Sequence, residues 1–157
     1  MSVQTAYAFT HIPGFVGQYG DLQLSNVFSR SIEGAEVDFG LAVVRGTADD
    51  QAILPSATGQ SFLGITGRTI AGTADTAGER KYQVGESANI LDEGTIYAIC
   101  EDGCTQGDPV FFRHTTGTGT VIGALRTDAD TATADEIPNA VWDTTTAAGE
   151  IGVVKFK

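Results

Sequence analysis

The sequence predicts an all-β protein in which short antiparallel strands form a β-sandwich or a barrel-like domain. Three observations predict this fold class. Short apolar runs recur along the chain, separated by turns rich in glycine and threonine. Charged residues make up only 18% of the chain, and the polar remainder is largely Thr, Ser and Gly, as is typical of strands and turns. At 157 residues, the chain has the size of one domain with an extended arm.

Residues 1–30 are predicted to form an extended N-terminal arm. Apolar and aromatic residues are spread here among Pro13 and several glycines, without a helical or strand period. An isolated segment could not bury these side chains in a core of its own. They must therefore lie on their own domain, on a neighbouring subunit or on another protein, and the intramolecular and intermolecular alternatives both stay open. The predicted interface residues are Tyr7, Phe9, Ile12, Phe15 and Tyr19.

Residues 31–157 are predicted to form a single β domain. Loose alternation over residues 35–44 indicates a strand pair or one bent strand, and residues 62–66 are predicted to form a return strand. Further strands are predicted at residues 82–90, 94–100, 108–113, 121–125, 137–143 and 150–156. Polar loops are predicted at residues 47–60, 71–80, 115–120 and 127–136. This gives roughly eight to ten short strands, spaced as in sandwiches and barrels.

Two segments of the predicted domain share a short pattern. Glu33-Gly-Ala-Glu-Val-Asp-Phe39 and Gln106-Gly-Asp-Pro-Val-Phe-Phe112 both place Gly three residues before Val and five before Phe. Each is followed by a polar loop and then by a return strand, which contains Phe62-Leu-Gly64 or Glu150-Ile-Gly152. The pattern predicts two related hairpin units that fold against one another within one domain.

The charge of the chain argues against two classes of partner. Twenty Asp and Glu against nine Lys and Arg give a formal net charge of -11. A surface of this sign repels nucleic acids and anionic membranes, and the basic residues are scattered singly, so we expect neither partner. The N-terminus lacks the pattern of a signal peptide and no apolar run approaches a membrane span, so we expect synthesis in the cytoplasm.

The two cysteines are the most obvious candidates for chemistry. Cys100 and Cys104 could bind zinc together with His11 and His114. However, metal knuckles usually have the spacing Cys-x2-Cys, whereas Glu-Asp-Gly here sets both thiols at the mouth of a hairpin. This favours buried or paired thiols, and a cytoplasmic origin argues against a required disulfide. We therefore predict no metal and no cofactor.

Catalytic motifs are not evident in the sequence. The Gly-x-Ser-x-Gly signature of a nucleophile is missing, and Gly117 and Gly119 lie in a threonine-rich tip without a lysine. Carboxylates such as Asp128 and Asp130 lack the spacing of a calcium loop. Two carboxylates would suffice for a small hydrolase, but acidic residues in polar loops are usually solvated surface. We predict that the protein is not an enzyme and has no catalytic residues.

Several short motifs follow one another in a defined order from about Gly17 onward. They are Gly34-x-x-Val37-x-Phe39-Gly40-x-Ala42-Val43, Pro55, Phe62-Leu-Gly-Ile65, Val84, Ile90, Gly94-x-Ile96-Tyr97, Gly107-Asp-Pro-Val110, Ala140-x-Trp142 and Gly152-x-Val154. Their order, their spacing and the total length resemble those of the cement (decoration) proteins of tailed-phage capsids.

The resemblance implies a structural virion protein with no catalytic motif. Such a protein would bind the capsid exterior as a homo-oligomer, a dimer or a trimer, and would bridge major capsid subunits to stabilise the shell. The predicted arm residues would then contact the capsid or a neighbouring subunit. The alternative is a receptor- or carbohydrate-binding β module of a phage tail or surface structure. A module of that kind would show clustered exposed aromatics, whereas Trp142 is the sole tryptophan and has a strand-like context.

Overall fold

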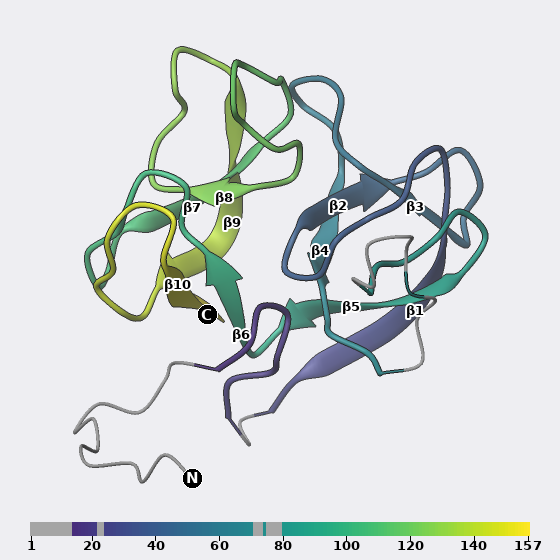
Figure 1. Cartoon of the computed structure of the whole chain (residues 1–157), viewed down its shortest axis with the longest axis horizontal. Helices are drawn as coiled ribbons and strands as arrows, with labels where there is room; N and C mark the ends of the chain where they lie inside the picture. The colour runs from purple at the N-terminus through teal and green to yellow at the C-terminus, as the bar shows by residue number, and fades with distance from the viewer. Residues whose placement is uncertain (1–13, 22–23, 71–73, 75–79) are drawn as a thin grey trace, which may run out of the picture.

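The computed structural model describes residues 14–21, 24–70, 74 and 80–157, which form two five-stranded units (Figure 1). The first unit is a closed barrel with strand order β1-β3-β2-β4-β5, and the second is a sheet with order β6-β10-β9-β7-β8. The all-β fold class is confirmed. The described residues contain no helix that is long and apolar enough to cross a membrane. The strands are β1 (Asn26–Ile32), β2 (Ala42–Arg45), β3 (Gln51–Ile53), β4 (Phe62–Thr66), β5 (Ser87–Glu93), β6 (Thr95–Ile99), β7 (Pro109–Arg113), β8 (Leu125–Arg126), β9 (Ala134–Trp142) and β10 (Ile151–Phe156).

The two units follow the same path through space. In the first unit, β1 pairs in parallel with β3, and the pairs β3–β2, β2–β4, β4–β5 and β5–β1 are antiparallel. In the second unit, β8–β7, β7–β9, β9–β10 and β10–β6 are antiparallel in the same way. A parallel bridge between Cys100 and Leu125 brings the end of β6 against β8. The strands β1 to β5 therefore correspond, in chain order, to β6 to β10, and corresponding strands have corresponding neighbours.

Backbone hydrogen bonds match between the units residue by residue. The matched pairs of bonds are Ile32 N to Glu86 O (2.9 Å) with Cys100 N to Glu150 O (3.0 Å), Glu33 N to Ala52 O (2.9 Å) with Glu101 N to Leu125 O (2.8 Å), and Gly40 N to Thr66 O (2.8 Å) with Gly107 N to Trp142 O (2.8 Å). Ile32 therefore corresponds to Cys100, and Glu33 corresponds to Glu101.

The two related units predicted from the sequence are present, but their alignment differs from the predicted one. The sequence pattern matched Gly34 with Gly107, whereas the hydrogen bonds match Gly40 with Gly107. Both of the matched glycines have a positive φ, +73° and +98°, which glycine adopts most readily. In the structure, the strand of the first unit that corresponds to β10 is β5 and not β4. The same hydrogen-bonded turn precedes β5 and β10.

One apolar cluster joins the two units. Ala42, Val44, Ile65 and Leu91 of the first unit belong to the same buried cluster as Trp142 and most of the second unit's core. A separate cluster around Tyr82 fills the interior of the first barrel. Because burial of apolar surface is the main driving force for folding, the shared cluster ties the stability of one unit to that of the other.

Two strands lie where the sequence predicted none. The first strand, β1, begins at Asn26, so the last five residues of the predicted arm belong to the barrel. The third strand, β3, lies inside the predicted loop at residues 47–60. It buries only Ala52 completely, so it is too short to produce a readable period.

Candidate interaction surface

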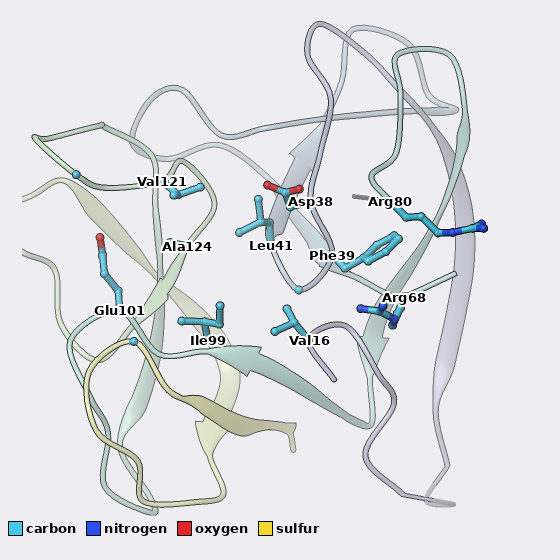
Figure 2. A pocket seen from close by; sticks show the side chains of 13 residues that line it. Val16, Asp38, Phe39, Leu41, Arg68, Arg80, Ile99, Glu101, Val121 and Ala124 are labelled. Carbon is cyan, nitrogen blue, oxygen red and sulfur yellow. The ribbon is translucent and has the colours of Figure 1, made fainter. Parts of the chain in front are cut away.

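A groove of about 840 Å³ lies between the two units (Figure 2). One wall comes from the first unit and the segment before it, and the other wall comes from the loops and strand ends of the second unit. We call this feature the groove throughout. The lining residues are Val16, Asp38, Phe39, Gly40, Leu41, Arg68, Arg80, Ile99, Glu101, Gly119, Val121, Ala124 and Gly149.

The second-unit wall of the groove exposes apolar side chains. Ile99 at the end of β6 is 45% exposed, and Val121 is 52% exposed. In a soluble protein, apolar groups gathered in a concave surface usually mark a place where another molecule binds.

The mouth of the groove carries a cation between two aromatic rings. The Arg68 guanidinium carbon lies 5.3 Å from the Phe15 ring centroid and 5.5 Å from that of Phe39. Phe15 itself is 65% exposed. Arginine and aromatic side chains that are partly exposed in the free protein are typical of the residues that dominate binding energy at protein interfaces.

Residues 17–20 form an extra antiparallel strand segment on the edge of β6. Gly17 N donates to Tyr97 O (2.7 Å), Tyr97 N donates to Gln18 O (2.9 Å), and Gly20 N donates to Thr95 O (2.8 Å). Tyr19 lies opposite Ile96 and packs against the shared cluster. Burial raises the pKa of the Tyr19 hydroxyl, and the nearby Tyr82 raises it further. The segment is therefore fixed to its own chain.

The predicted interface residues have different positions. Phe15 lies beside the groove with its ring exposed, while Tyr19 packs against its own domain, which is the intramolecular alternative. The residues Tyr7, Phe9 and Ile12 lie outside the described part of the chain.

Sequence reasoning did not identify Arg68, Ile99 or Val121 as interaction residues. Arg68 lies outside the predicted elements, whereas Ile99 and Val121 lie in two predicted strands, and only the packing of the two units brings the three to one groove. A reader of the sequence could have noted the apolar Ile99 at the end of a predicted strand, but nothing there indicates that its side chain faces outward.

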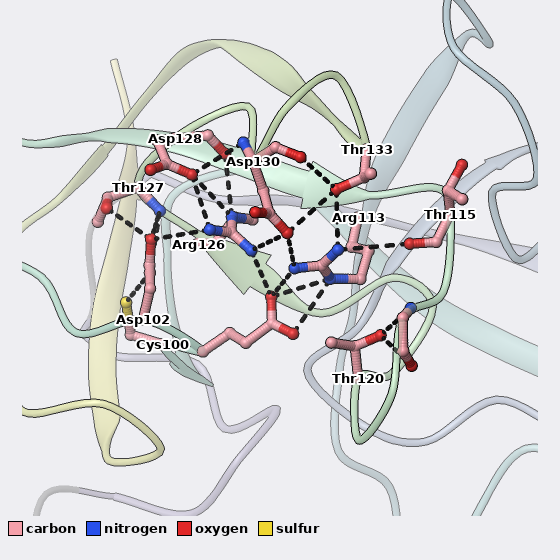
Figure 3. Close-up of polar contacts among 12 residues, drawn as sticks. Cys100, Asp102, Arg113, Thr115, Thr120, Arg126, Thr127, Asp128, Asp130 and Thr133 are labelled. Carbon is pink, nitrogen blue, oxygen red and sulfur yellow. Dashed lines mark hydrogen bonds and ion pairs between the residues drawn. The ribbon is translucent and has the colours of Figure 1, made fainter.

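A charged network lies behind the second-unit wall (Figure 3). The guanidinium of Arg113 is buried and bonds Glu101 Oε2 (2.9 Å) and Asp130 Oδ2 (2.7 Å). Arg126 bonds the same two carboxylates and also Asp128 Oδ1 (2.7 Å). The hydrogen bond from Arg113 lowers the pKa of Asp130, and the charge of Arg126 adds to this effect. The network fixes the loop that follows β8, in which Asp130 has a positive φ of 39°.

The two cysteines are free and buried. Cys100 Sγ donates to Asp102 Oδ1 at 3.4 Å, and Cys104 Sγ donates to Thr144 O at 3.3 Å. Burial raises the pKa of the Cys100 thiol, and the neighbouring Cys104 raises it further, so Cys100 is held as a thiol and not as the nucleophilic thiolate. Within the described residues, no three His, Cys, Asp or Glu side chains converge as a metal site.

These features define an all-β protein that presents an apolar and aromatic contact surface. The only tryptophan, Trp142, is fully buried, so its ring is not available to stack on a sugar. The sequence matches the family described as structural cement protein (E217 gp24/Pam3 gp6) over residues 3–157. The chain therefore belongs to this family of phage structural proteins, and its role is that of a structural protein associated with the capsid.

The comparison with solved structures finds a similar fold in a phage capsid. A chain in the capsid of Myoviridae phage XM1 matches with a TM-score of 0.70 and 15% identity, covering 99% of this chain and 97% of that chain. The base of the head fibre gp8.5 of bacteriophage phi29 matches with a TM-score of 0.45 and 12% identity, covering 85% of this chain and 95% of that chain. A search of the curated proteins finds no match.

Proposed function

We propose that this chain binds the exterior of a tailed-phage capsid and bridges neighbouring major capsid subunits, so that the shell resists opening. The chain acts as a homo-oligomer, a dimer or a trimer. It contacts the capsid or a neighbouring subunit through the arm residues Tyr7, Phe9, Ile12 and Phe15, with Tyr19 fastening the arm to its own domain. Arg68 and the groove continue this contact surface.

The observation that carries the proposal is the exposed Phe15–Arg68 pair beside the groove. Both side chains are exposed in the isolated chain, with the guanidinium carbon 5.3 Å from the ring centroid. Burying an aromatic ring and an arginine at the centre of a contact contributes much more to binding than a rim contact does. The bridging role further requires that one copy contact two capsid subunits through this surface.

The charge of the chain supports an exterior position. A net charge of -11 is unfavourable beside packaged DNA, whose phosphates carry the same sign. No chemistry is needed for the proposed role. A protein that bridges a seam adds its binding free energy to the cost of opening that seam, and many weak contacts on one shell add up.

The test is binding to capsids of the same virus that lack this chain. Phe15→Ala and Arg68→Ala should each weaken binding by about thirtyfold or more, because hot-spot truncations cost about 2 kcal/mol or more. Val84→Ala is the matched control, since Val84 is 58% exposed but does not line the groove. Equal binding by all three variants would place the contact surface elsewhere. Saturated capsids should also open at a higher temperature than bare capsids, and an unchanged temperature would contradict the bridging role.

A further inference from the structure

The matched units have matched strand edges, and the described part of the chain covers only one of these edges. On β6, the N–H and C=O groups that point away from β10 belong to Thr95, Tyr97 and Ile99, because Cys100 N bonds Glu150 O and alternate residues point to opposite sides. Residues 17–20 cover this edge at Thr95 and Tyr97 through three hydrogen bonds.

The corresponding edge of the first unit belongs to β1. Since Ile32 corresponds to Cys100, Val27 corresponds to Thr95 and Ser29 corresponds to Tyr97. Ile32 N bonds Glu86 O, so the backbone groups of Val27 and Ser29 point away from β5. On that side, β3 pairs with β1 only from Ser31 onward.

Nothing in the described chain pairs with this part of β1 as a strand. Ser29 O accepts a hydrogen bond from the Arg30 side chain (2.9 Å), and no backbone partner for Val27 or Ser29 is found on that side among the described residues. The exposures agree with this difference, because Thr95 is 4% exposed whereas its counterpart Val27 is 40% exposed. Leu24, just before β1, is 84% exposed. An uncovered edge with exposed apolar side chains is a template for one more strand.

We propose that residues 3–9 of a second copy of this chain add an antiparallel strand to the β1 edge at Val27 and Ser29. This inference rests on the self-association included in the proposed function. The added strand would occupy the place that residues 17–20 occupy on β6. Backbone hydrogen bonds would supply the affinity, and the alternate side chains would supply the specificity, as in other cases of strand addition.

The sequence of residues 3–9 fits this role. Pro13 and the glycines interrupt any period over the whole arm. Residues 3–9 contain neither Pro nor Gly, and β-branched or aromatic residues alternate there with Gln and Ala. None of residues 1–20 is Asp, Glu, Lys or Arg. The segment can therefore approach a chain of net charge -11 without repulsion. The β-branched and aromatic side chains of the window are those of Val3, Thr5, Tyr7 and Phe9.

A second copy is the occupant that this arrangement favours. Every copy carries both the segment and the edge, so two copies can exchange segments and close a symmetric dimer with two equal contacts. Residues 17–20 of each copy stay on their own β6, which leaves each terminal segment attached close to its own domain.

The first test removes a backbone N–H donor from the uncovered edge of β1. Ser29→Pro deletes an N–H that points away from β5, and proline is tolerated at such positions. Sedimentation equilibrium should show self-association about tenfold weaker than for the wild type, and Ser29→Ala, which keeps the N–H, should match the wild type. A wild-type chain that is monomeric throughout, or equal association by the two variants, would overturn the proposal. Because Ser29→Pro could disturb β1, a chain lacking residues 1–9 is the second variant, and it should weaken association at least as much, since it removes the whole added strand.

The second test identifies which copy supplies the strand. Chains carrying Thr5→Cys are mixed with chains carrying Val27→Cys and treated with a short bis-maleimide, to which the buried native thiols are not accessible. The expected product is a covalent dimer formed only in the mixture. In a chain that carries both cysteines, a cross-link within one monomer would overturn the second copy as occupant. Capsid binding is measured separately through Phe15→Ala, so loss of self-association and loss of capsid binding remain distinguishable.

Discussion

The two units of this chain follow one path but are closed by different interactions. In the first unit, Glu33 accepts hydrogen bonds from Thr47 N and Thr47 Oγ1, both at 2.8 Å. Its counterpart Glu101 instead bonds the guanidinium groups of Arg113 and Arg126. At this matched position, the glutamate of the first unit bonds a neutral threonine, whereas the glutamate of the second unit bonds two arginine cations.

The difference follows from how each unit closes. The first barrel closes through a parallel ladder with two residue pairs between β1 and β3, whereas the second unit has one parallel bridge between Cys100 and Leu125. Where strand pairing is weaker, the charged network ties the strands and the loop after β8 together. A repeated backbone path can therefore be kept while the interactions that stabilise it are exchanged.

Breaking the charged network should give the largest effect on stability. Arg113→Met leaves Glu101 and Asp130 paired with Arg126 but without the buried Arg113 guanidinium, and losing hydrogen bonds to charged groups costs about 2 to 3 kcal/mol. Chemical denaturation should show this loss of unfolding free energy. Arg45→Met is the control, because Arg45 is exposed at the end of β2 and should change stability by only about 0.5 kcal/mol. Equal effects from the two variants would show that the network does not stabilise the second unit.

Exchanging the residue types at one pair of corresponding positions tests the alignment of the two units. Gly152 corresponds to Ala88, and a Cβ at Gly152 would lie 2.9 Å from Trp142 Cζ3. Gly152→Ala should therefore lower the unfolding free energy by about 1 to 3 kcal/mol through overpacking. Ala88→Gly should cost about 1 kcal/mol, through backbone entropy and the loss of a buried methyl group. A stabilising Gly152→Ala would mean that Trp142 does not pack on this glycine.

Acid should weaken the interactions of Glu33 in the first unit and of Asp130 in the second unit by the same mechanism. The pKa of Asp130 is lowered by its hydrogen bond from Arg113, and that of Glu33 is lowered by its hydrogen bonds from Thr47. A carboxyl with a lowered pKa in the folded state stabilises the fold above its ordinary pKa, and this contribution is lost as the pH falls through its folded-state pKa. Unfolding free energy should fall between neutral pH and about pH 3, less steeply in Asp130→Asn and Glu33→Gln. Ala88→Gly, which changes no carboxyl group, should keep the wild-type slope.

Replacing the two cysteines should have the smallest effect on the unfolding free energy. Replacing both Cys100 and Cys104 by Ser keeps a donor near Asp102 and near Thr144, so stability should change by about 1 kcal/mol or a little more and capsid binding should not change. In the wild type, thiol reagents should not modify either cysteine until the protein unfolds. Rapid modification of the folded protein, or zinc bound in stoichiometric amount, would contradict this account.

The sequence predicted the fold class because strand composition and turn residues are local signals. It also indicated two related units, although the pattern around Gly34 was aligned six residues away from Gly40, the structural match for Gly107. Strands such as β3 could not be predicted, because three residues with one buried side chain carry no period.

The interaction surface was less accessible to sequence reasoning than the fold. Phe15 stood out as an apolar residue in a segment without a core, but Arg68 gains its role only from the rings of Phe15 and Phe39 on either side. Tyr19 looked like its neighbours in the arm, and only the pairing of residues 17–20 with β6 distinguishes it from them. Contacts between residues that are distant in sequence leave no local pattern.

The most direct test of the central proposal is a cryo-electron microscopy reconstruction of capsids of the same virus that lack this chain, after the purified protein is added. We expect density on the outer surface across junctions between major capsid subunits, with Phe15 and Arg68 against the shell. Density on the inner surface or confined to a single subunit would contradict the proposal, as would capsids that remain bare at saturating protein.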